Sequence, residues 1–409
     1  MQEEKQKILY ISALAAPEVQ EDIFRRSGVN PGFAMQKFNR LLAEGLAANH
    51  AEVTALSSPP VVPGSLKRCE NFKNSEHGGV RYIHLPIIDF PVFRQFLISI
   101  LTFFRVLSFS FGPGEKRNKS IICDILNTGI TSGALLAARL CRIRTIGILT
   151  DMPGLMVGTS GLKSRLSEMG MRFLMSKYSG YVFLTESMNG PVNRHNRPYI
   201  VMEGVVDGEL AITSLEEKRK DETDDNRRTG PEKIVIYAGG LFREYGIGIL
   251  IDGFRKVSHP DIRLHLYGAG PMVEEIKGIS EKDSRIRYMG QLPNGQIVEN
   301  EKKGWLLVNP RPTDAEFVKY SFPSKNMEYM STGTPVLTTN LPGMPDEYHD
   351  YVYILDEETP RGIARMLDEL LALPPEEMRE KGLKAAQFVA GKKNKIERGK
   401  EILQLTGVC

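Results

Sequence analysis

The sequence predicts an α/β protein of two domains, each built around a parallel β-sheet. Its 409 residues exceed what one ordinary core holds and fit two domains. Short β-rich runs alternate with helical patterns in both halves, which is typical of parallel sheets. A strongly polar stretch lies between the halves. With 41% hydrophobic and 25% charged residues, the composition is that of a globular protein and excludes wholesale disorder.

The first predicted domain covers residues 1–212. It opens with the strand-like run KILYISAL at residues 7–14, followed by a long loop and the helical pattern AMQKFNRLLAEGL. Further strands are expected to begin at Ala51, Val80, Ser120, Thr145 and Tyr181, with helix-like stretches between several of them.

Residues 213–232 form the predicted linker. The run is almost wholly polar and contains a Gly-Pro breaker, so we expect it to contribute nothing to a core. The strand and helix alternation restarts after it and defines a second domain at residues 233–390. Its strands are expected to begin at Lys233, Arg263, Ile286, Gly304, Thr334 and Tyr351.

Charge and cysteine content narrow the functional class. Fifty-three Lys and Arg against fifty Asp and Glu give a net charge of +3, which excludes a dedicated nucleic-acid binder. The four cysteines lie far apart without CxxC spacing, so neither a zinc site nor a disulfide framework is indicated. The N-terminus lacks the pattern of a signal peptide. We therefore expect a cytoplasmic protein without a metal site.

One apolar segment, residues 86–112, is dense in Phe, Leu and Ile. Asp89, Arg94 and Arg105 divide it into runs that we expect to be too short to span a bilayer. Two interpretations stay open: a buried helix plus a loop, or an interfacial helix that lies on a membrane. The basic helical run at residues 161–177 would add charge to such a surface, or would be core on one face.

The most informative stretch is TDAEFVKYSFPSKNMEYMSTGTPVLTTN, at residues 313–340. A Ser-Phe-Pro-Ser turn leads into a short helix, whose N-terminus would present free N–H groups to an anion. Lys325 and Glu328 share one face of that helix, where they could serve a diphosphate and a ribose diol. The alternative interpretation is that Ser324 is an N-cap and Glu328 a solvated carboxylate.

The run FPSKNMEYMSTGTPV, at residues 322–336, resembles the family-4 glycosyltransferases of the GT-B fold, particularly bacterial enzymes of surface-polysaccharide assembly. The stretches IYAGGLFREYGIGILIDGF, LHLYGAGP, IRYMGQLP and VMEGVVD agree with this resemblance. It implies two Rossmann-like domains facing an interdomain cleft, with residues 391–409 as a closing helix that crosses back to the first domain. It further implies transfer of a hexose or related sugar from a nucleotide sugar, with UDP or GDP, to a glycan or lipid-linked glycan. We expect retention at the anomeric carbon and no cofactor. We also expect action in the cytoplasm or at the inner face of the plasma membrane.

The resemblance also assigns the donor-site residues. Glu328 matches the second Glu of the family's Glu-x7-Glu pattern and is expected to hold the ribose, whereas the first Glu falls at Tyr320. The family's Arg and Lys that hold the diphosphate fall near Gly240 and Tyr245, so we expect Arg243 and Lys325 to replace them. The other expected donor contacts are the glycine pair Gly239 and Gly240, the turn Tyr320, Ser321, Phe322, Pro323 and Ser324, and Gly290 and Gln291 against the base.

In the first domain, Asp151 ends the strand in ILTDMPG, where the family often carries a His or Asp facing the reacting sugar. It would orient the acceptor or stabilise positive charge at the anomeric carbon, or else serve as a turn or helix N-cap before Pro153. Two rival functions stay open. One is a nucleotide-sugar epimerase or hydrolase. The other, suggested by the missing first Glu and Arg-Lys pair, is a non-catalytic nucleotide-sugar-binding subunit.

Overall fold

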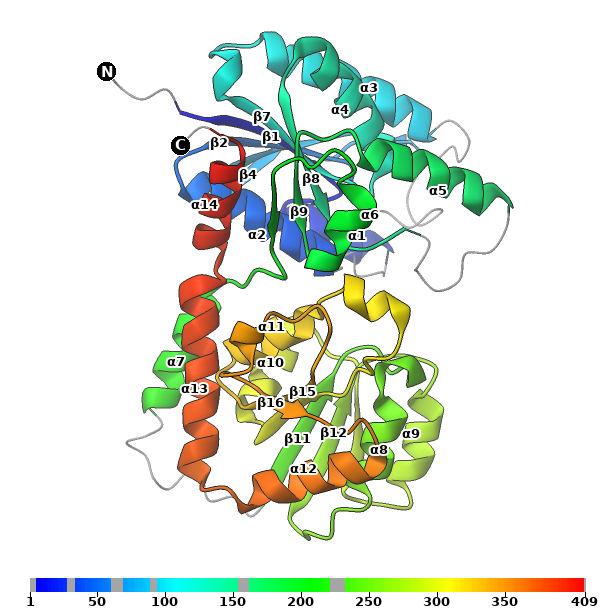
Figure 1. Cartoon of the computed structure of the whole chain (residues 1–409), viewed down its shortest axis with the longest axis vertical. Helices are drawn as coiled ribbons and strands as arrows, with labels where there is room; N and C mark the ends of the chain where they lie inside the picture. The colour runs from blue at the N-terminus through cyan, green and yellow to red at the C-terminus, as the bar shows by residue number, and fades with distance from the viewer. Residues whose placement is uncertain are drawn as a thin grey trace. The chain divides into compact units, whose positions relative to one another are not determined.

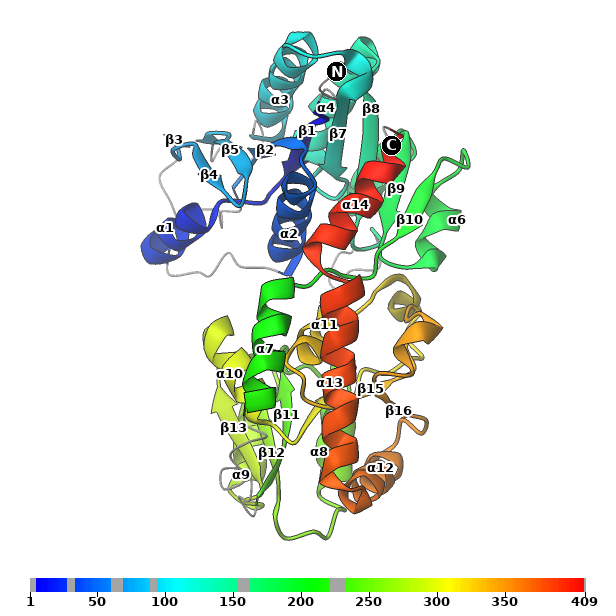
Figure 2. The same cartoon turned by 90° about the vertical axis from the view of Figure 1, so that its left-hand side faces the viewer.

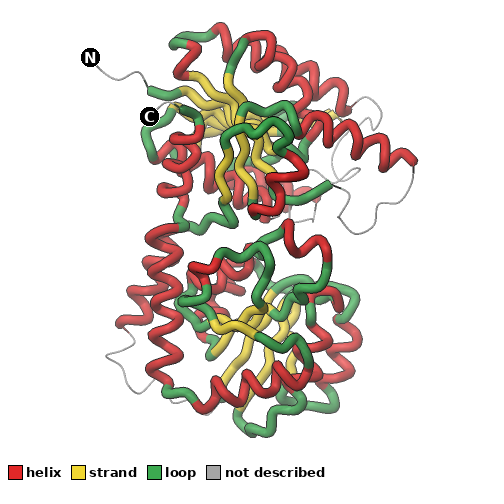
Figure 3. The backbone as a smooth tube through the Cα atoms, viewed as in Figure 1, coloured by secondary structure: helices red, strands yellow, loops and turns green. Residues whose placement is uncertain are grey.

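A computed structural model describes residues 5–27, 34–59, 69–88, 94–153, 162–220 and 232–407. The chain forms two compact units, Met1–Val205 together with Lys395–Cys409, and Val206–Asn394 (Figure 1). In each unit, parallel strands are enclosed by helices (Figure 3). This confirms the predicted class of two α/β domains with parallel sheets.

The first unit contains, in its described part, an eight-stranded sheet of order β10-β9-β8-β7-β1-β2-β5-β4. Every pair in it is parallel except β4 with β5. A separate antiparallel pair joins β3 (Cys69–Glu70) to β6 (Ile87–Ile88). The sheet strands are β1 (Lys7–Ser12), β2 (Glu52–Ser57), β4 (Ser75–His77), β5 (Val80–His84), β7 (Lys119–Asp124), β8 (Arg144–Leu149), β9 (Gly180–Phe183) and β10 (Tyr199–Val201).

Helices cover both faces of this sheet (Figure 2). α2 packs on β2 and β5 with α14 beside it, while α4 packs on β1, β7 and β8 and carries α3 on its outer side. The helices of the unit are α1 (Pro17–Ser27), α2 (Ala34–Ala48), α3 (Arg94–Phe111), α4 (Thr128–Cys141), α5 (Leu162–Met175), α6 (Asn189–Val192) and α14 (Lys395–Leu405), with 3-10 turns η1 (Lys116–Asn118) and η2 (Glu186–Met188).

The expected long loop after the first strand contains the helix α1. Pro17 stands at its first position and Glu18 in its first turn, and Arg25 and Arg26 lie in its last turn. All four placements favour a helix, because proline needs no hydrogen bond there and the charges complement the helix dipole. The sequence prediction missed this element because the helix is short and mostly polar.

The second unit has, in its described part, a fully parallel six-stranded sheet of order β13-β12-β11-β14-β15-β16. Its strands are β11 (Lys233–Ala238), β12 (Ile262–Tyr267), β13 (Ile286–Gly290), β14 (Leu306–Asn309), β15 (Val336–Thr339) and β16 (Tyr353–Leu355). Its helices are α7 (Gly208–Lys220), α8 (Ile247–Phe254), α9 (Val273–Ser280), α10 (Asn294–Lys303), α11 (Ser324–Ser331), α12 (Pro360–Ala372) and α13 (Pro375–Lys392), with 3-10 turns η4 (Arg243–Tyr245), η5 (Glu316–Tyr320) and η6 (Asp346–Tyr348).

The central strand β11 shows why this sheet is buried on both faces. Val235 and Tyr237 belong to the core under α8, α9 and α12, whereas Ile236 and Ala238 belong to the core under α11 and α13. Because successive strand residues point to opposite faces, a continuous apolar run such as IVIYA requires helices on both sides.

The boundary between the units differs from the predicted linker. The second unit begins at Val206, and α7 occupies the first part of the range 213–232. Ser214 and Leu215 are buried in that helix, which packs on α13. The expectation that this run contributes nothing to a core was therefore wrong at its start, because one narrow face of a polar helix is enough to bury two side chains. Residues 221–231 lie outside the described part.

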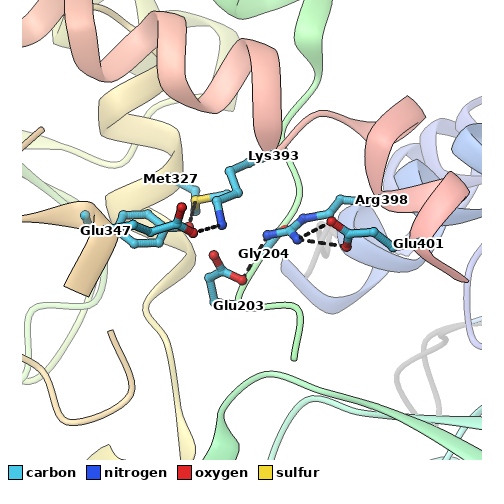
Figure 4. Close-up of polar contacts among 8 residues, drawn as sticks. Glu203, Gly204, Met327, Glu347, Lys393, Arg398 and Glu401 are labelled. Atoms are coloured by element: carbon cyan, nitrogen blue, oxygen red, sulfur yellow. Dashed lines mark hydrogen bonds and ion pairs between the residues drawn. The ribbon is translucent and has the colours of Figure 1, made fainter. Parts of the chain in front are cut away.

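The end of the chain belongs to the first unit from Lys395 onward, where α14 packs on α2. Its Arg398 guanidinium is buried and contacts three groups of that unit, as Figure 4 shows. It donates to the Glu203 carboxylate over 2.9 Å, to the Gly204 carbonyl over 3.2 Å and to the Glu401 carboxylate over 2.9 Å. In the second unit, the buried Lys393 amine donates to the Glu347 carboxylate over 2.5 Å.

α3, from the apolar segment 86–112, has two different faces. Ile98, Thr102, Val106 and Ser110 recur every four residues and are buried, and α3 packs along α4. The opposite face is exposed, so α3 is not a fully buried helix. Among the described helices, α3 is the one long and apolar enough to cross a membrane by length and composition, contrary to the expectation that its charges divide it into shorter runs. Residues 89–93, with Asp89, lie outside the described part.

Candidate donor-binding site in the second unit

Three glycines meet at the carboxyl edge of the second sheet, where β11, β12 and β13 end. The Gly239 N–H donates to the Tyr267 carbonyl over 2.9 Å, and the Gly268 N–H donates to the Gly290 carbonyl over 2.9 Å. A Cβ on Gly268, whose φ is +129°, would lie 1.9 Å from the Gly239 carbonyl oxygen. The structure thus brings the predicted residues Gly239 and Gly290 to one edge, and adds Gly268 from the YGAGP run. Ligands of parallel α/β sheets bind at this edge.

Lys325 lies directly against this glycine edge. It is the second residue of α11, and its amine donates to the Tyr237 hydroxyl over 2.6 Å. The amine also lies 4.2 Å from the centre of the Tyr237 ring, within the range of a cation–π contact. A Cβ on Gly239 would lie 1.8 Å from the Lys325 Nζ, so a larger residue there would displace the amine. Glycine at position 239 therefore makes room for the cation.

Burial, together with the nearby charge of Arg311, lowers the pKa of Lys325 to about 7, while Glu328 and Glu301 oppose the shift. Part of the lysine side chain still reaches solvent, but its amine end is enclosed by Tyr237 and Gly239. A cation held at such a cost in free energy is suited to an anionic ligand, which would supply the missing counter-charge.

Arg311 is a further candidate site residue, which the sequence analysis did not name. It follows β14, the strand beside β11, in the run VNPRPT. Its guanidinium carbon lies 4.9 Å from the Phe317 ring centre and 5.4 Å from that of Tyr245, so two aromatic rings hold it in place. Arg311 and Lys325 together form a pair of neighbouring cations at the carboxyl edge of the sheet. The only signal in the sequence was an Arg directly after a buried strand.

The start of α11 supplies backbone donors beside Lys325. The helix begins at Ser324, the N-cap position is Pro323, and no side chain caps it. The alternative that Ser324 is an N-cap was therefore wrong, since the chain enters helical geometry one residue earlier. Ser324 is exposed. An uncapped helix N-terminus next to two cations favours binding of an anion such as a phosphate.

Glu328 lies one turn after Lys325 on α11 and is half-buried. Its negative charge partly opposes the lowering of the Lys325 pKa. The structure thus places these two predicted residues on one face.

The remaining predicted donor residues lie around α11 and the glycine edge. Tyr320 and Ser321 are half-buried at the end of η5. Phe322 packs in the core, 5.3 Å from the Tyr348 ring, and Pro323 is buried, so these two side chains fix the turn before α11. Two predicted residues follow strand ends: the Gly240 carbonyl accepts from the Tyr237 hydroxyl over 2.8 Å, and Gln291 is exposed after Gly290.

Arg243, the other predicted cation, pairs with an acidic side chain of the same unit. In η4 its guanidinium pairs with the Glu275 carboxylate of α9 over 2.6 Å, and both side chains are largely exposed. Among the described residues, Arg311 is the cation whose charge acts on Lys325.

Asp151 lies in the first unit, half-buried after β8. Its negative charge acts on Asp124, the last residue of the neighbouring strand β7. Asp124 is buried, which raises its pKa to about 6, and its carboxylate accepts from the Leu126 N–H over 3.2 Å and the Ser12 hydroxyl over 3.4 Å. Sequence reasoning singled out Asp151 and missed Asp124, which ends the run SIICD. Within the described ranges, no group of three or more His, Cys, Asp or Glu side chains could hold a metal ion.

Comparison with known proteins finds a family model that matches most of the second unit. Residues 218–387 match the family model of glycosyl transferases group 1. No curated protein sequence matches the chain.

Several solved structures share the fold along nearly the whole chain. HepE of Anabaena, in complex with UDP, has a TM-score of 0.63 and 11% identity, covering 98% of this chain and 100% of that one. Sucrose-phosphate synthase of Thermosynechococcus elongatus has a TM-score of 0.63 and 16% identity, and a glycosyltransferase of Rickettsia africae has 0.63 and 12%; each covers 98% of both chains. The chain therefore has the GT-B fold, and its residues 218–387 match the family model of glycosyl transferases group 1, which indicates glycosyltransferase activity.

Proposed function

We propose that this glycosyltransferase moves a hexose or related sugar from a UDP or GDP sugar to an acceptor hydroxyl. The observation that carries the proposal is the pair of cations, Lys325 and Arg311, at the glycine edge where β11, β12 and β13 end. A binding site for a nucleoside diphosphate needs cations that balance the phosphate charges and a backbone that approaches the phosphates closely. This edge of the sheet offers both. The structures of HepE with UDP and with UDP-glucose support the donor class by analogy of fold.

In this proposal the donor lies along the carboxyl edge of the second sheet. The diphosphate contacts Lys325, Arg311 and the free N–H groups at the start of α11, and Glu328 accepts hydrogen bonds from the ribose diol. The base lies against Gly290 and Gln291, where a side chain on Gly290 would meet nothing within 4 Å. We assign the diphosphate to Arg311 in preference to Arg243, because Arg243 already pairs with Glu275.

The proposed transfer proceeds with retention and without a metal ion. As the glycosidic bond breaks, negative charge grows on the departing diphosphate, and preorganised cations stabilise it more than they stabilise the bound donor. Lys325 is suited to this role because its amine is already desolvated and fixed by Tyr237. In the first unit we assign Asp151 to orienting the acceptor hydroxyl, with Asp124 beside it as a second carboxylate.

We further propose, from the resemblance to family 4, that the acceptor is a glycan or lipid-linked glycan of a cell-surface polysaccharide. The reaction would then take place in the cytoplasm, at the inner face of the plasma membrane. The exposed apolar face of α3 supports contact with a membrane.

A donor panel tests this function. Calorimetry with UDP, GDP and their sugars is expected to show strong binding of one of the two nucleotides. NMR of the product is expected to show the same anomeric configuration as in the donor. Activity is expected to persist in EDTA. Turnover of the donor without any acceptor would instead favour an epimerase or hydrolase, and tight donor binding without transfer to any glycan acceptor would favour a non-catalytic binder.

A further inference from the structure

The first unit carries an unusual concentration of exposed apolar side chains. Fourteen large apolar side chains are exposed in the described part of the chain, and nine of them lie on α3, α4 and α5. α3 packs along α4, and α4 contacts α5, so the three helices are neighbours (Figure 1). We call the exposed side of these helices the three-helix surface. Its exposed apolar residues are Phe96, Leu97, Ile100, Phe104, Phe111, Leu136, Leu140, Met169 and Phe173.

α3 shows that the exposure is organised. Ile100, Phe104 and Phe111 are spaced by four and seven residues, so they share one face, opposite the buried stripe that packs on α4. The side chains of Phe96 and Phe104 are 64% and 62% exposed. Contiguous exposed apolar faces of this kind mark a surface that another molecule or a membrane covers when the protein functions.

The charge of the same segment indicates what covers it. Residues 94–177 contain twelve Lys and Arg but only four Asp and Glu, whereas the rest of the chain contains forty-one and forty-six. The segment is therefore strongly positive, while the remainder is negative. Exposed basic side chains lie among or beside the apolar ones; they are Arg105, Lys116, Arg117, Arg139, Arg142, Arg172 and Lys177. The Lys177 amine lies 4.2 Å from the Phe173 ring centre.

The attachment of α3 argues against a spanning orientation. The Ser99 carbonyl of α3 approaches α4 so closely that a Cβ on Gly133 would lie 1.9 Å from its oxygen. The Lys119 amine at the start of β7 donates to the carbonyls of Ser110 and Gly112 over 3.1 and 2.7 Å. α3 is thus fixed to the first unit along its length, and its exposed apolar side chains lie on the face that points away from α4.

We propose that the three-helix surface binds the surface of an anionic lipid bilayer, with its aromatic side chains in the headgroup region and its basic side chains on the lipid phosphates. This rests on the membrane location proposed for the enzyme and is independent of the donor site. A second copy of the chain would fit less well, because two such positive surfaces would repel each other.

The test is flotation of the full-length protein with vesicles of phosphatidylcholine, alone or with 30% phosphatidylglycerol. The protein is expected to float with the anionic vesicles and to lose binding as salt rises. Phe96→Ser together with Phe104→Ser is expected to weaken binding by about tenfold or more, because each ring buries apolar area at the interface. Arg105→Glu with Arg139→Glu is expected to have a similar effect.

Matched controls remove the same groups elsewhere. Phe24→Ser changes an exposed Phe on α1, and Lys256→Glu with Lys282→Glu reverses the same charge on the second unit; these variants are expected to float like the wild type. Flotation unaffected by the Phe96 and Phe104 substitutions, or no flotation at low salt, would overturn the proposal. Loss of dimerisation in those variants without any lipid binding would overturn it in favour of a second copy. Donor affinity of all variants, measured by calorimetry, is expected to equal that of the wild type. A failure of the proposed donor site would therefore be distinguished from a failure of the proposed lipid-binding surface.

Discussion

The Lys325 amine donates to the Tyr237 hydroxyl over 2.6 Å, and that hydroxyl donates to the Gly240 carbonyl over 2.8 Å. The two side chains come from α11 and β11, 88 residues apart in the sequence. These two hydrogen bonds hold the Lys325 amine beside the glycine pair Gly239 and Gly240 before any ligand binds. Preorganisation of this kind is what electrostatic stabilisation of a leaving group requires.

Gly239→Ala is expected to lower transfer activity sharply while the protein stays folded. The new Cβ would lie 1.8 Å from the Lys325 Nζ, so the amine must leave its position beside Tyr237. Gly278→Ala on α9 is the control, because a Cβ there meets nothing within 4 Å. Activity and melting temperature of both variants are the measurements. Equal activities would show that the position of the Lys325 amine is unimportant.

Glu328→Ala is expected to weaken donor binding through the ribose. The loss of a charged hydrogen bond costs about 1.5–3 kcal/mol, roughly tenfold to a hundredfold in affinity. Calorimetry with the donor nucleotide measures it, with Glu274→Ala, an exposed carboxylate of α9, as the control. An unchanged affinity in the Glu328 variant would mean that the ribose lies elsewhere.

Donor binding is expected to take up a proton near pH 8. In the free protein the pKa of Lys325 is about 7, below its ordinary value of 10.5, so the amine is largely neutral there. A bound diphosphate favours the charged amine and raises its pKa, so affinity falls as pH rises through 7. The same shift makes this group's contribution to the free energy of unfolding increase from about pH 7 to 10.5, because only the unfolded chain holds the proton in that window.

Calorimetry at pH 8 in HEPES and in Tricine counts that proton through the ionisation heats of the buffers. Lys325→Met is expected to abolish the uptake. Binding heats that do not depend on the buffer in the wild type would refute the linkage.

Arg398→Ala is expected to destabilise the first unit by about 3–5 kcal/mol, because it removes the guanidinium from the buried Glu203 carboxylate. Arg365→Ala removes an exposed partner of Glu357 and is expected to cost less than about 1 kcal/mol. Thermal and urea unfolding of the two variants compare these costs. Similar melting temperatures for both would show that the buried pair contributes no more than the exposed one.

Much of the fold was predictable because apolar runs such as IVIYA and SIICD alternate with helical patterns. The boundary was placed too late because α7 is polar except for one narrow face that buries Ser214 and Leu215. Composition alone does not reveal such a face. The helix α1 was missed for a similar reason, since its signals are end charges and a proline rather than an apolar period.

Sequence reasoning named candidate site residues where they lie close together in the sequence. Lys325 and Glu328 share one helix, and Gly239 ends a clear strand. Arg311 was missed because it joins the site only through the strand order, in which β14 lies beside β11. Arg243 was chosen for its closeness to Gly239, but its partner Glu275 stands 32 residues away on α9, where no local pattern points to it.

The central claim is that Lys325 and Arg311 receive the diphosphate and stabilise it as the leaving group. The most direct measurement compares the transfer rate and donor affinity of Lys325→Ala, Arg311→Ala and Arg243→Ala with those of the wild type. Lys325→Ala and Arg311→Ala are each expected to lower kcat by about 10²–10³-fold with a smaller loss of donor affinity, because charge grows on the diphosphate only as the bond breaks. Arg243→Ala is expected to stay near wild type, since its ion pair with Glu275 is exposed. Full turnover by Lys325→Ala, or a loss confined to Arg243→Ala, would contradict the account.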